Sequence, residues 1–173
     1  MLRPAPHENA TQRLMSAVYG TGVVPFHIDS ANSRVPPHLT FVCLATGNAS
    51  KWPTPLHDSV ALPLRADEQV QLHQDVWYVD GGRERFLTSI LSRPGFSQNG
   101  IVRFDPSCMK PGHPKFKRSA DLLERACRGV SPIRVDWEAG VRIILDNWRV
   151  LHARGLPPQA NENRVLERVM IAT

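Results

Sequence analysis

The sequence predicts a mainly β (α+β) fold, a barrel or jelly roll with a helical, loop-rich insert. Three observations lead to this prediction. Short apolar segments with strand character lie towards both ends of the chain, and two helical patterns lie between them. Fifteen prolines and eleven glycines divide the sequence into short pieces, which favours short strands and loops over long helices. Strands at both ends with helices between them are typical of a jelly roll or barrel that carries an insert.

The strand predictions rest on short apolar stretches bounded by turn residues. Residues 11–19 are compatible with a short helix or a first strand. We expect strands at 23–29, 38–46, 133–137, 141–146, a segment through His152, and 164–172. Glu138, Ala139 and Gly140 form the turn between two of these strands.

Two helices are expected inside an insert that covers about residues 60–130. The first spans 67–79, with Asp67 as its N-cap and with Val70, His73, Val76 and Trp77 on one face. The second spans 119–128, with Ser119 as its cap and Gly129 just past its end. Residues 80–118 read as loop-rich because they carry several glycine and proline pairs.

Composition narrows the class of protein. The 173 residues are 42% hydrophobic and 21% charged, so we expect one domain over residues 1–173. We find no apolar run of membrane-spanning length, and three cysteines without a CxxC spacing suggest a reducing, cytoplasmic location. The net charge is +5, but only residues 110–118 form a basic cluster. A solvated loop explains that cluster better than nucleic acid binding.

The candidate chemistry lies in His27, Asp29 and His152. His27 and Asp29 are two residues apart in an extended segment, so their side chains can share a face. Two imidazoles and one carboxylate are the ligand set that holds non-haem Fe(II) and leaves positions open. An isolated HxD pattern is also compatible with a polar pair near a turn.

Two arginines follow in the last predicted strand. Arg164 and Arg168 share one face of that strand with Leu166 and Met170. Two cations on one face of an apolar strand are costly unless they are paired or exposed. A carboxylate ligand would satisfy one of them in bidentate fashion. The alternative is an edge strand whose arginines are solvated.

Taken together, these residues resemble a known enzyme family. The segment from Trp137 through Asp146-Asn-Trp-Arg-Val-Leu-His152-Ala-Arg is similar to the distal metal-ligand motif of the taurine dioxygenase and γ-butyrobetaine hydroxylase superfamily. Pro25-Phe-His27-Ile-Asp29 resembles the first ligand motif of that family. Thr54 and the Arg164-Val-Leu-Glu-Arg168 strand resemble the elements that bind its co-substrate.

The resemblance implies a double-stranded β-helix with an Fe(II)- and 2-oxoglutarate-dependent oxygenase activity. It implies that His27, Asp29 and His152 bind Fe(II), and that Arg164 and Thr54 bind the far carboxylate of 2-oxoglutarate. Arg168 is expected to contact the co-substrate or a substrate anion, unless it pairs with an acidic neighbour. Dioxygen would oxidise a small molecule while 2-oxoglutarate yields succinate and CO2. Related halogenases lack the carboxylate, so Asp29 implies hydroxylation, desaturation or epoxidation.

Other functions remain open at this point. The chain could be a catalytically silent jelly roll that binds a small molecule or partner, or a Zn-dependent hydrolase with the same three ligands. A nucleic-acid-modifying oxygenase has only the basic cluster in its support. Because few residues precede His27, we also expect either a site that is more open than usual or a second subunit, in a homo-oligomer, that covers the shortened N-terminal region.

Overall fold

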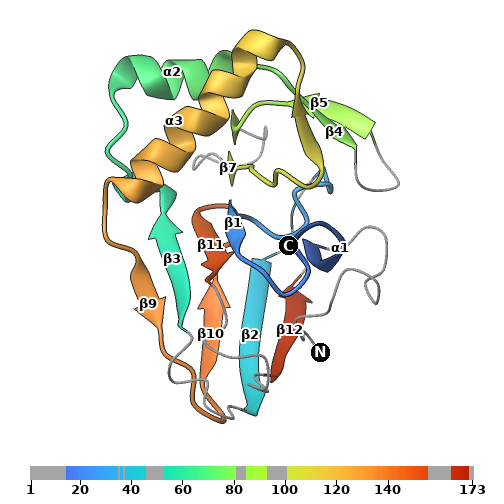
Figure 1. Cartoon of the computed structure of the whole chain (residues 1–173), viewed down its shortest axis with the longest axis vertical. Helices are drawn as coiled ribbons and strands as arrows, with labels where there is room; N and C mark the ends of the chain where they lie inside the picture. Colours follow the sequence, from blue (N-terminus) through green and yellow to red (C-terminus); the bar gives the residue numbers. More distant parts are fainter. Residues whose placement is uncertain are drawn as a thin grey trace.

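Two antiparallel sheets carry the first and last strands of the described chain, and a helical unit is inserted between two strands of the first sheet (Figure 1). The computed structural model describes residues 15–34, 36, 38–45, 53–80, 85–92, 101–155 and 165–171. The first sheet has the strand order β1-β11-β3-β9, and the second has the order β10-β2-β12. These strands are β1 (Val24–His27), β2 (His38–Ala45), β3 (Thr54–Asp58), β9 (Ile133–Val135), β10 (Arg142–Leu145), β11 (Val150–Arg154) and β12 (Val165–Ile171).

The strand predictions agree well with these elements. A short helix, α1 (Met15–Tyr19), settles the ambiguous first segment within the described residues. β1, β2, β9, β10, β11 and β12 all fall inside or overlap the predicted strand segments. β3 was not predicted as a strand, because Pro55 and the polar residues that surround it hide the pattern.

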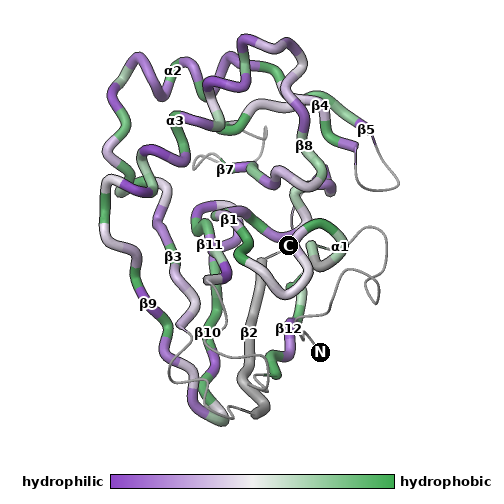
Figure 2. The backbone as a smooth tube through the Cα atoms, in the orientation of Figure 1, coloured by the Kyte–Doolittle hydropathy of each residue, from purple (hydrophilic) through white to green (hydrophobic). Residues whose placement is uncertain are grey.

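The insert between β3 and β9 contains both helices and two small sheets. Its elements are η3 (Ser59–Ala61), α2 (Ala66–Gln74), β4 (Trp77–Asp80), β5 (Arg85–Thr88), β6 (Leu91–Ser92), β7 (Ile101–Val102), β8 (Met109–Pro111), η4 (Pro114–Phe116) and α3 (Lys117–Arg128). β5, β4 and β8 form one sheet, and β6 pairs with β7. The helices carry hydrophilic residues along much of their length (Figure 2), as expected for helices with one solvent face.

The prediction for the first insert helix is wrong about the residue at which the helix ends and about which of its faces is buried. α2 stops at Gln74, Asp75 is extended, and Trp77 lies in β4. The helix buries Glu68 and Leu72, whereas Val70 is exposed. Buried Glu68 accepts a hydrogen bond from the Arg65 main-chain N–H and pairs with Arg125 of α3, so polar contacts select this face.

The N-cap predictions for the two helices are also corrected. Arg65 precedes α2, and Asp67 lies within its first turn. α3 begins at Lys117, two residues before Ser119, and the Ser119 hydroxyl hydrogen-bonds buried Asp75 at the far end of α2. Gly129 caps the C-terminus of α3 as predicted. None of the helices in the described ranges is long and apolar enough to cross a membrane.

Two clusters of buried side chains hold the layers together. The smaller cluster contains Leu56 of β3, Leu145 of β10, Leu166 of β12 and Trp137, so it joins the two larger sheets face to face. The larger cluster joins Leu151 of β11 to α2, α3 and the strands of the insert. β11 therefore has packed side chains on both of its faces, because successive residues alternate between the two clusters.

Candidate metal centre

His27 and His152 lie side by side on adjacent strands. His27 ends β1, His152 lies in β11, and the antiparallel register places the two residues opposite each other. Directly opposed residues project to the same face of a sheet. Their ring centroids are 4.4 Å apart, and both side chains are buried. The sheet pairing thus joins two residues that are distant in sequence.

Asp29 completes the group from a turn rather than from a strand. β1 ends at His27, and Ser30 adopts a left-handed conformation with φ of 56°. The Asp29 Oδ1 atom lies 3.8 Å from His27 Nε2 and 3.7 Å from His152 Nε2. His27 and Asp29 therefore lie close together as expected, but not through the alternation of side chains along a strand. The turn after β1 places the Asp29 carboxylate beside the two histidines.

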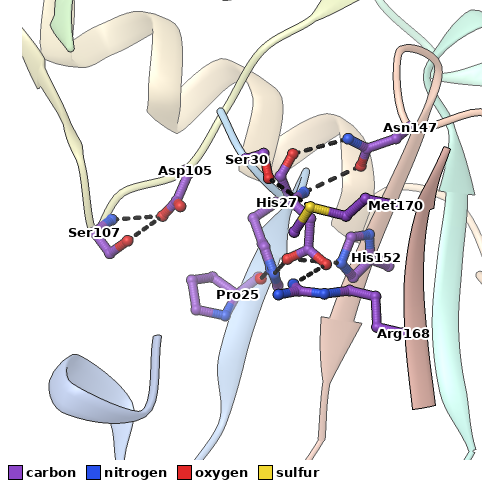
Figure 3. Close-up of polar contacts among 10 residues, drawn as sticks. Pro25, His27, Ser30, Asp105, Ser107, Asn147, His152, Arg168 and Met170 are labelled. Carbon is purple, nitrogen blue, oxygen red and sulfur yellow. Dashed lines mark hydrogen bonds and ion pairs between the residues drawn. The ribbon is translucent and has the colours of Figure 1, made fainter. Parts of the chain in front are cut away.

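The donor atoms of these three side chains all lie within 4.8 Å of one another. Figure 3 shows His27 and His152 close together, with the Arg168 side chain beside them. His27 Nδ1 lies 2.8 Å from the Pro25 carbonyl oxygen and donates to it, which leaves the Nε2 lone pair directed at the group. Two imidazole nitrogens and one carboxylate oxygen fit a divalent iron with open coordination positions.

Burial and charge favour the protonation states that bind metal. Burial, helped by the neighbouring His152, lowers the pKa of His27 to about 4, although Asp29 and the Pro25 carbonyl act in the opposite direction. Burial alone would raise the pKa of Asp29. The hydrogen bond and charge of His152, together with Arg168, outweigh it and hold that pKa well below its ordinary range. At neutral pH, His27 is neutral and Asp29 is ionised.

Asn147 fixes the main chain of Asp29, and sequence reasoning gave it no such role. The Asn147 side chain is fully buried in the turn that precedes β11. Its Oδ1 atom accepts from the Asp29 N–H at 3.1 Å, and its Nδ2 group donates to the Asp29 carbonyl oxygen at 2.8 Å. The turn that leads to His152 therefore also holds Asp29. The only sequence signal was the position of Asn147 inside the distal motif.

Arg168 lies on β12 and reaches the carboxylate from the second sheet. Its guanidinium donates to Asp29 Oδ2 at 2.5 Å, so the two oxygens of Asp29 have different neighbours. In this structure Arg168 makes the ion pair with an acidic neighbour that the sequence analysis held as the alternative. Arg164, the predicted ligand of the distal carboxylate, lies outside the described residues.

Thr54 begins β3 on the same side of the first sheet as the two histidines. Leu56 pairs with His152 across β3 and β11, and Thr54 is two residues from Leu56, so alternation gives all three one face. The Thr54 hydroxyl accepts a hydrogen bond from buried Trp137 Nε1 at 2.8 Å. This contact holds the hydroxyl at a defined place on the face that carries the candidate ligands.

Several other residues lie apart from this group. His57 is buried on the opposite face, where its ring centroid lies 4.4 Å from that of Phe26. His73 and His113 are exposed in the insert. Cys108 and Cys127 are buried free thiols. Arg103 of the insert is also buried.

Comparisons with known proteins identify the fold. No protein-family model matches the sequence, and no curated protein matches it. Solved structures do match. An asparagine oxygenase in complex with Fe(II), hydroxyasparagine and succinate aligns with a TM-score of 0.72 at 15% identity, over 88% of this chain and 51% of the other. The non-haem iron oxygenase OrfP with Fe and α-ketoglutaric acid has a TM-score of 0.68 at 21% identity, over 87% and 49%.

A third match is PvcB from Pseudomonas aeruginosa, with a TM-score of 0.68 at 20% identity, over 92% of this chain and 60% of the other. The chain thus spans about half the length of the first two oxygenases. The structural likeness confirms the expected fold class at the level of architecture. The described chain has the taurine dioxygenase-like fold of the non-haem iron oxygenases.

Proposed function

We propose that the protein is a non-haem Fe(II)- and 2-oxoglutarate-dependent oxygenase that hydroxylates a small molecule. One observation carries the proposal, namely the buried convergence of His27, Asp29 and His152 from two strands and a turn. The fold supports it independently, because solved structures with this fold contain Fe together with α-ketoglutaric acid or succinate. A fold alone does not define an activity, and here the site and the fold favour the same chemistry.

The proposed roles follow from the positions of the side chains. His27, Asp29 and His152 hold the iron, which when bound supplies the activation of dioxygen at the expense of 2-oxoglutarate. Thr54 is proposed to donate its hydroxyl hydrogen to the far carboxylate of 2-oxoglutarate, since its oxygen already accepts from Trp137. Arg164 is proposed to pair with that same carboxylate.

Arg168 is proposed to contact the co-substrate or an anionic group of the substrate. Its side chain is about one quarter exposed and is already close to the ligand Asp29. A guanidinium has five donor hydrogens, so Arg168 can keep its bond to Asp29 and still bind a second anion. This arrangement would place an anionic group of a ligand beside the metal.

We also propose that the two larger sheets form a double-stranded β-helix over one domain of 173 residues, with residues 60–130 as its insert. The chain alternates between the sheets, since β1, β3, β9 and β11 belong to the first and β2, β10 and β12 to the second. Such alternation is typical of jelly rolls. The insert lies between β3 and β9, which is the one large interruption of the pattern within the described part of the chain.

The substrate class is proposed from the comparisons. The matched asparagine oxygenase is in complex with hydroxyasparagine, and one matched structure of OrfP is in complex with hydroxy-L-arginine. An amino acid or a similar biosynthetic intermediate is therefore proposed for this chain, and free L-amino acids are the first compounds to test. A homo-oligomer that covers the metal centre stays a prediction, which light scattering in solution tests.

An anaerobic titration tests the proposed cofactors. Purified apo-protein is titrated with Fe(II) and then with 2-oxoglutarate, while the visible metal-to-ligand charge-transfer band is recorded. The band is expected in the wild type, absent in His152→Ala and weaker in Arg164→Ala. A panel of amino acids is then screened for succinate formation that depends on dioxygen.

Other outcomes would favour the competing functions. A folded wild type that binds neither Fe(II) nor 2-oxoglutarate would contradict the oxygenase and favour a silent jelly-roll binding protein. A hydrolytic activity that needs Zn²⁺ but is indifferent to dioxygen and 2-oxoglutarate would favour the hydrolase. Tight nucleic acid binding with a steep salt dependence would reopen the nucleic-acid-modifying alternative.

A further inference from the structure

The segment Ile101–Asp105 of the insert is hydrogen-bonded to the end of β1, next to His27 and Asp29, and to the turn that precedes β11 and His152. The Ile28 N–H, flanked by His27 and Asp29, donates to the Phe104 carbonyl oxygen at 2.9 Å. The Val102 N–H donates to the carbonyl oxygen of Trp148, in the turn before β11, at 2.8 Å. One short stretch of the insert is thus hydrogen-bonded to both ligand-bearing parts of the first sheet.

Arg103 lies in the middle of this stretch and points at the turn that follows Asp29. Its side chain is 3% exposed. The guanidinium donates to the main-chain carbonyl oxygens of Ala31, Ser33 and Arg34 at 2.5 to 2.7 Å. The Phe86 ring lies beneath the cation, 5.1 Å from the guanidinium carbon to the ring centroid. Burial lowers the pKa of Arg103 to about 10, so the group stays charged at neutral pH.

The turn needs such a partner for two reasons. Ser30 holds a left-handed conformation, which costs a non-glycine residue about 1–2 kcal/mol. The three carbonyl oxygens converge on one point, and without a donor they would repel one another and lose their hydrogen bonds. Within the main chain of the turn, the Ser33 N–H donates to the Ser30 carbonyl oxygen at 2.9 Å.

We propose that Arg103 is a positioning residue for Asp29, acting through the turn of residues 30–34. This inference rests on the proposed function, since it gives Asp29 the role of metal ligand. Arg103 makes none of its described contacts with the three candidate ligands themselves. The planar fork of arginine spans carbonyl groups that are up to three residues apart, and the compact ammonium of lysine is a poorer match for that spread.

The test compares Arg103→Met and Arg103→Lys with Arg85→Met. Arg85 is an exposed arginine of the same insert that pairs with Asp80, so its loss controls for a change of charge. Hydrogen exchange in the metal-free protein is followed at the amides of Asp29 and Ser33. Fe(II) affinity is measured by anaerobic titration of each folded variant.

Arg103→Met is expected to speed exchange at both amides and to weaken Fe(II) binding about 10- to 100-fold, the usual loss when a group that orients a ligand is removed. Arg103→Lys is expected to fall between Arg103→Met and the wild type, and it carries the test if the methionine variant does not fold. Arg85→Met is expected to match the wild type in both measurements.

The inference is overturned if the lysine variant unfolds at a lower temperature while its folded form keeps wild-type exchange at Asp29 and Ser33 and wild-type Fe(II) affinity. Arg103 would then serve the stability of the fold alone. A wild type that exchanges slowly at these amides but binds no Fe(II) would instead contradict the proposed function. The exchange measurement needs no metal, so the two failures can be told apart.

Discussion

The two larger sheets differ in what covers them. β11 of the first sheet packs against the smaller cluster on one face and against the insert on the other, and its Leu151 is fully buried. The second sheet is packed on its inner face, where Leu145 and Leu166 lie, but its outer face exposes Ile144, Val169 and Ile171. The candidate ligands His27 and His152 belong to the first sheet, and His152 lies on β11, the strand that is packed on both faces.

This difference indicates which side chains are held tightly in place. A side chain on a strand that is packed on both faces has little freedom to shift, because the interior is close-packed. The second sheet contributes Arg168 from its inner face, while its outer face exposes the apolar side chains of Ile144, Val169 and Ile171. We therefore expect changes in the first sheet to affect metal binding or folding strongly, and changes on the outer face of the second sheet to have small effects.

The largest effect is expected for His152→Ala. This change removes one of the three proposed ligands. Fe(II) affinity should therefore fall by more than the roughly 100-fold that is typical when a residue hydrogen-bonded to a ligand is removed. The charge-transfer band with 2-oxoglutarate should disappear. His113→Ala, at an exposed site of the insert, is the matched control and should titrate like the wild type. Retention of the band in His152→Ala would remove this residue from the proposed ligand set.

Paired truncations test the covering of the two sheets directly. Leu151→Ala removes a fully buried side chain and should lower the free energy of unfolding by about 2–5 kcal/mol. Ile144 is 73% exposed, so Ile144→Ala should stay within about 0.5 kcal/mol of the wild type. Urea denaturation measures both. A loss for Ile144→Ala as large as that for Leu151→Ala would mean that the outer face is covered in solution.

The sequence allowed most strands and the three candidate ligands to be predicted. Strands at both ends of the chain carry local patterns, and the ligands lie in motifs that resemble a family. The end of α2 was not predictable in this way, because the apolar spacing of Val76 and Trp77 suits a continued helix as well as a new strand. Where α2 ends, Asp75 accepts a hydrogen bond from the hydroxyl of Ser119, which lies near the start of α3. This contact joins residues that are 44 positions apart.

Contacts across long sequence distances account for the rest of the site. Asn147 binds the main chain of a residue 118 positions away, and no local pattern encodes that pairing. The same holds for Arg103, which is about 70 positions from the carbonyl groups that it binds. A buried arginine has no signature in a single sequence, because exposed arginines look identical there.

Thr54→Val tests the role of the first residue of β3, which lies on the same face of the sheet as the candidate ligands. The valine keeps the shape of the side chain but leaves buried Trp137 Nε1 without its acceptor, at a cost of about 1–3 kcal/mol in stability. It also removes the proposed donor to 2-oxoglutarate, so affinity for the co-substrate should fall about tenfold. Thr54→Ser keeps the hydroxyl and should restore most of both. Unchanged 2-oxoglutarate affinity in a destabilised valine variant would limit Thr54 to a role in folding.

A smaller effect than that of Thr54→Val is expected at the partly exposed ion pair between Asp58, which ends β3, and Arg149, which precedes β11. Arg149, half exposed in the turn before β11, donates through Nε to Asp58 Oδ1 at 2.6 Å. This hydrogen bond lowers the pKa of Asp58 below its ordinary value of 3.8, against the opposing effect of burial. Exposed ion pairs contribute about 0.2–1 kcal/mol, so Arg149→Gln should lower the free energy of unfolding by that amount at pH 7.

The pH dependence of that loss identifies its cause. A carboxylate whose pKa is depressed in the folded state stabilises it above the unfolded pKa, and this stabilisation disappears as the pH falls through the folded pKa. The difference between wild type and Arg149→Gln should therefore be constant above about pH 5 and shrink in the acid range below the ordinary Asp58 value of 3.8. Denaturation curves at several pH values measure it. A difference that persists in acid would show that the Arg149 side chain stabilises the fold through packing and not through its ion pair with Asp58.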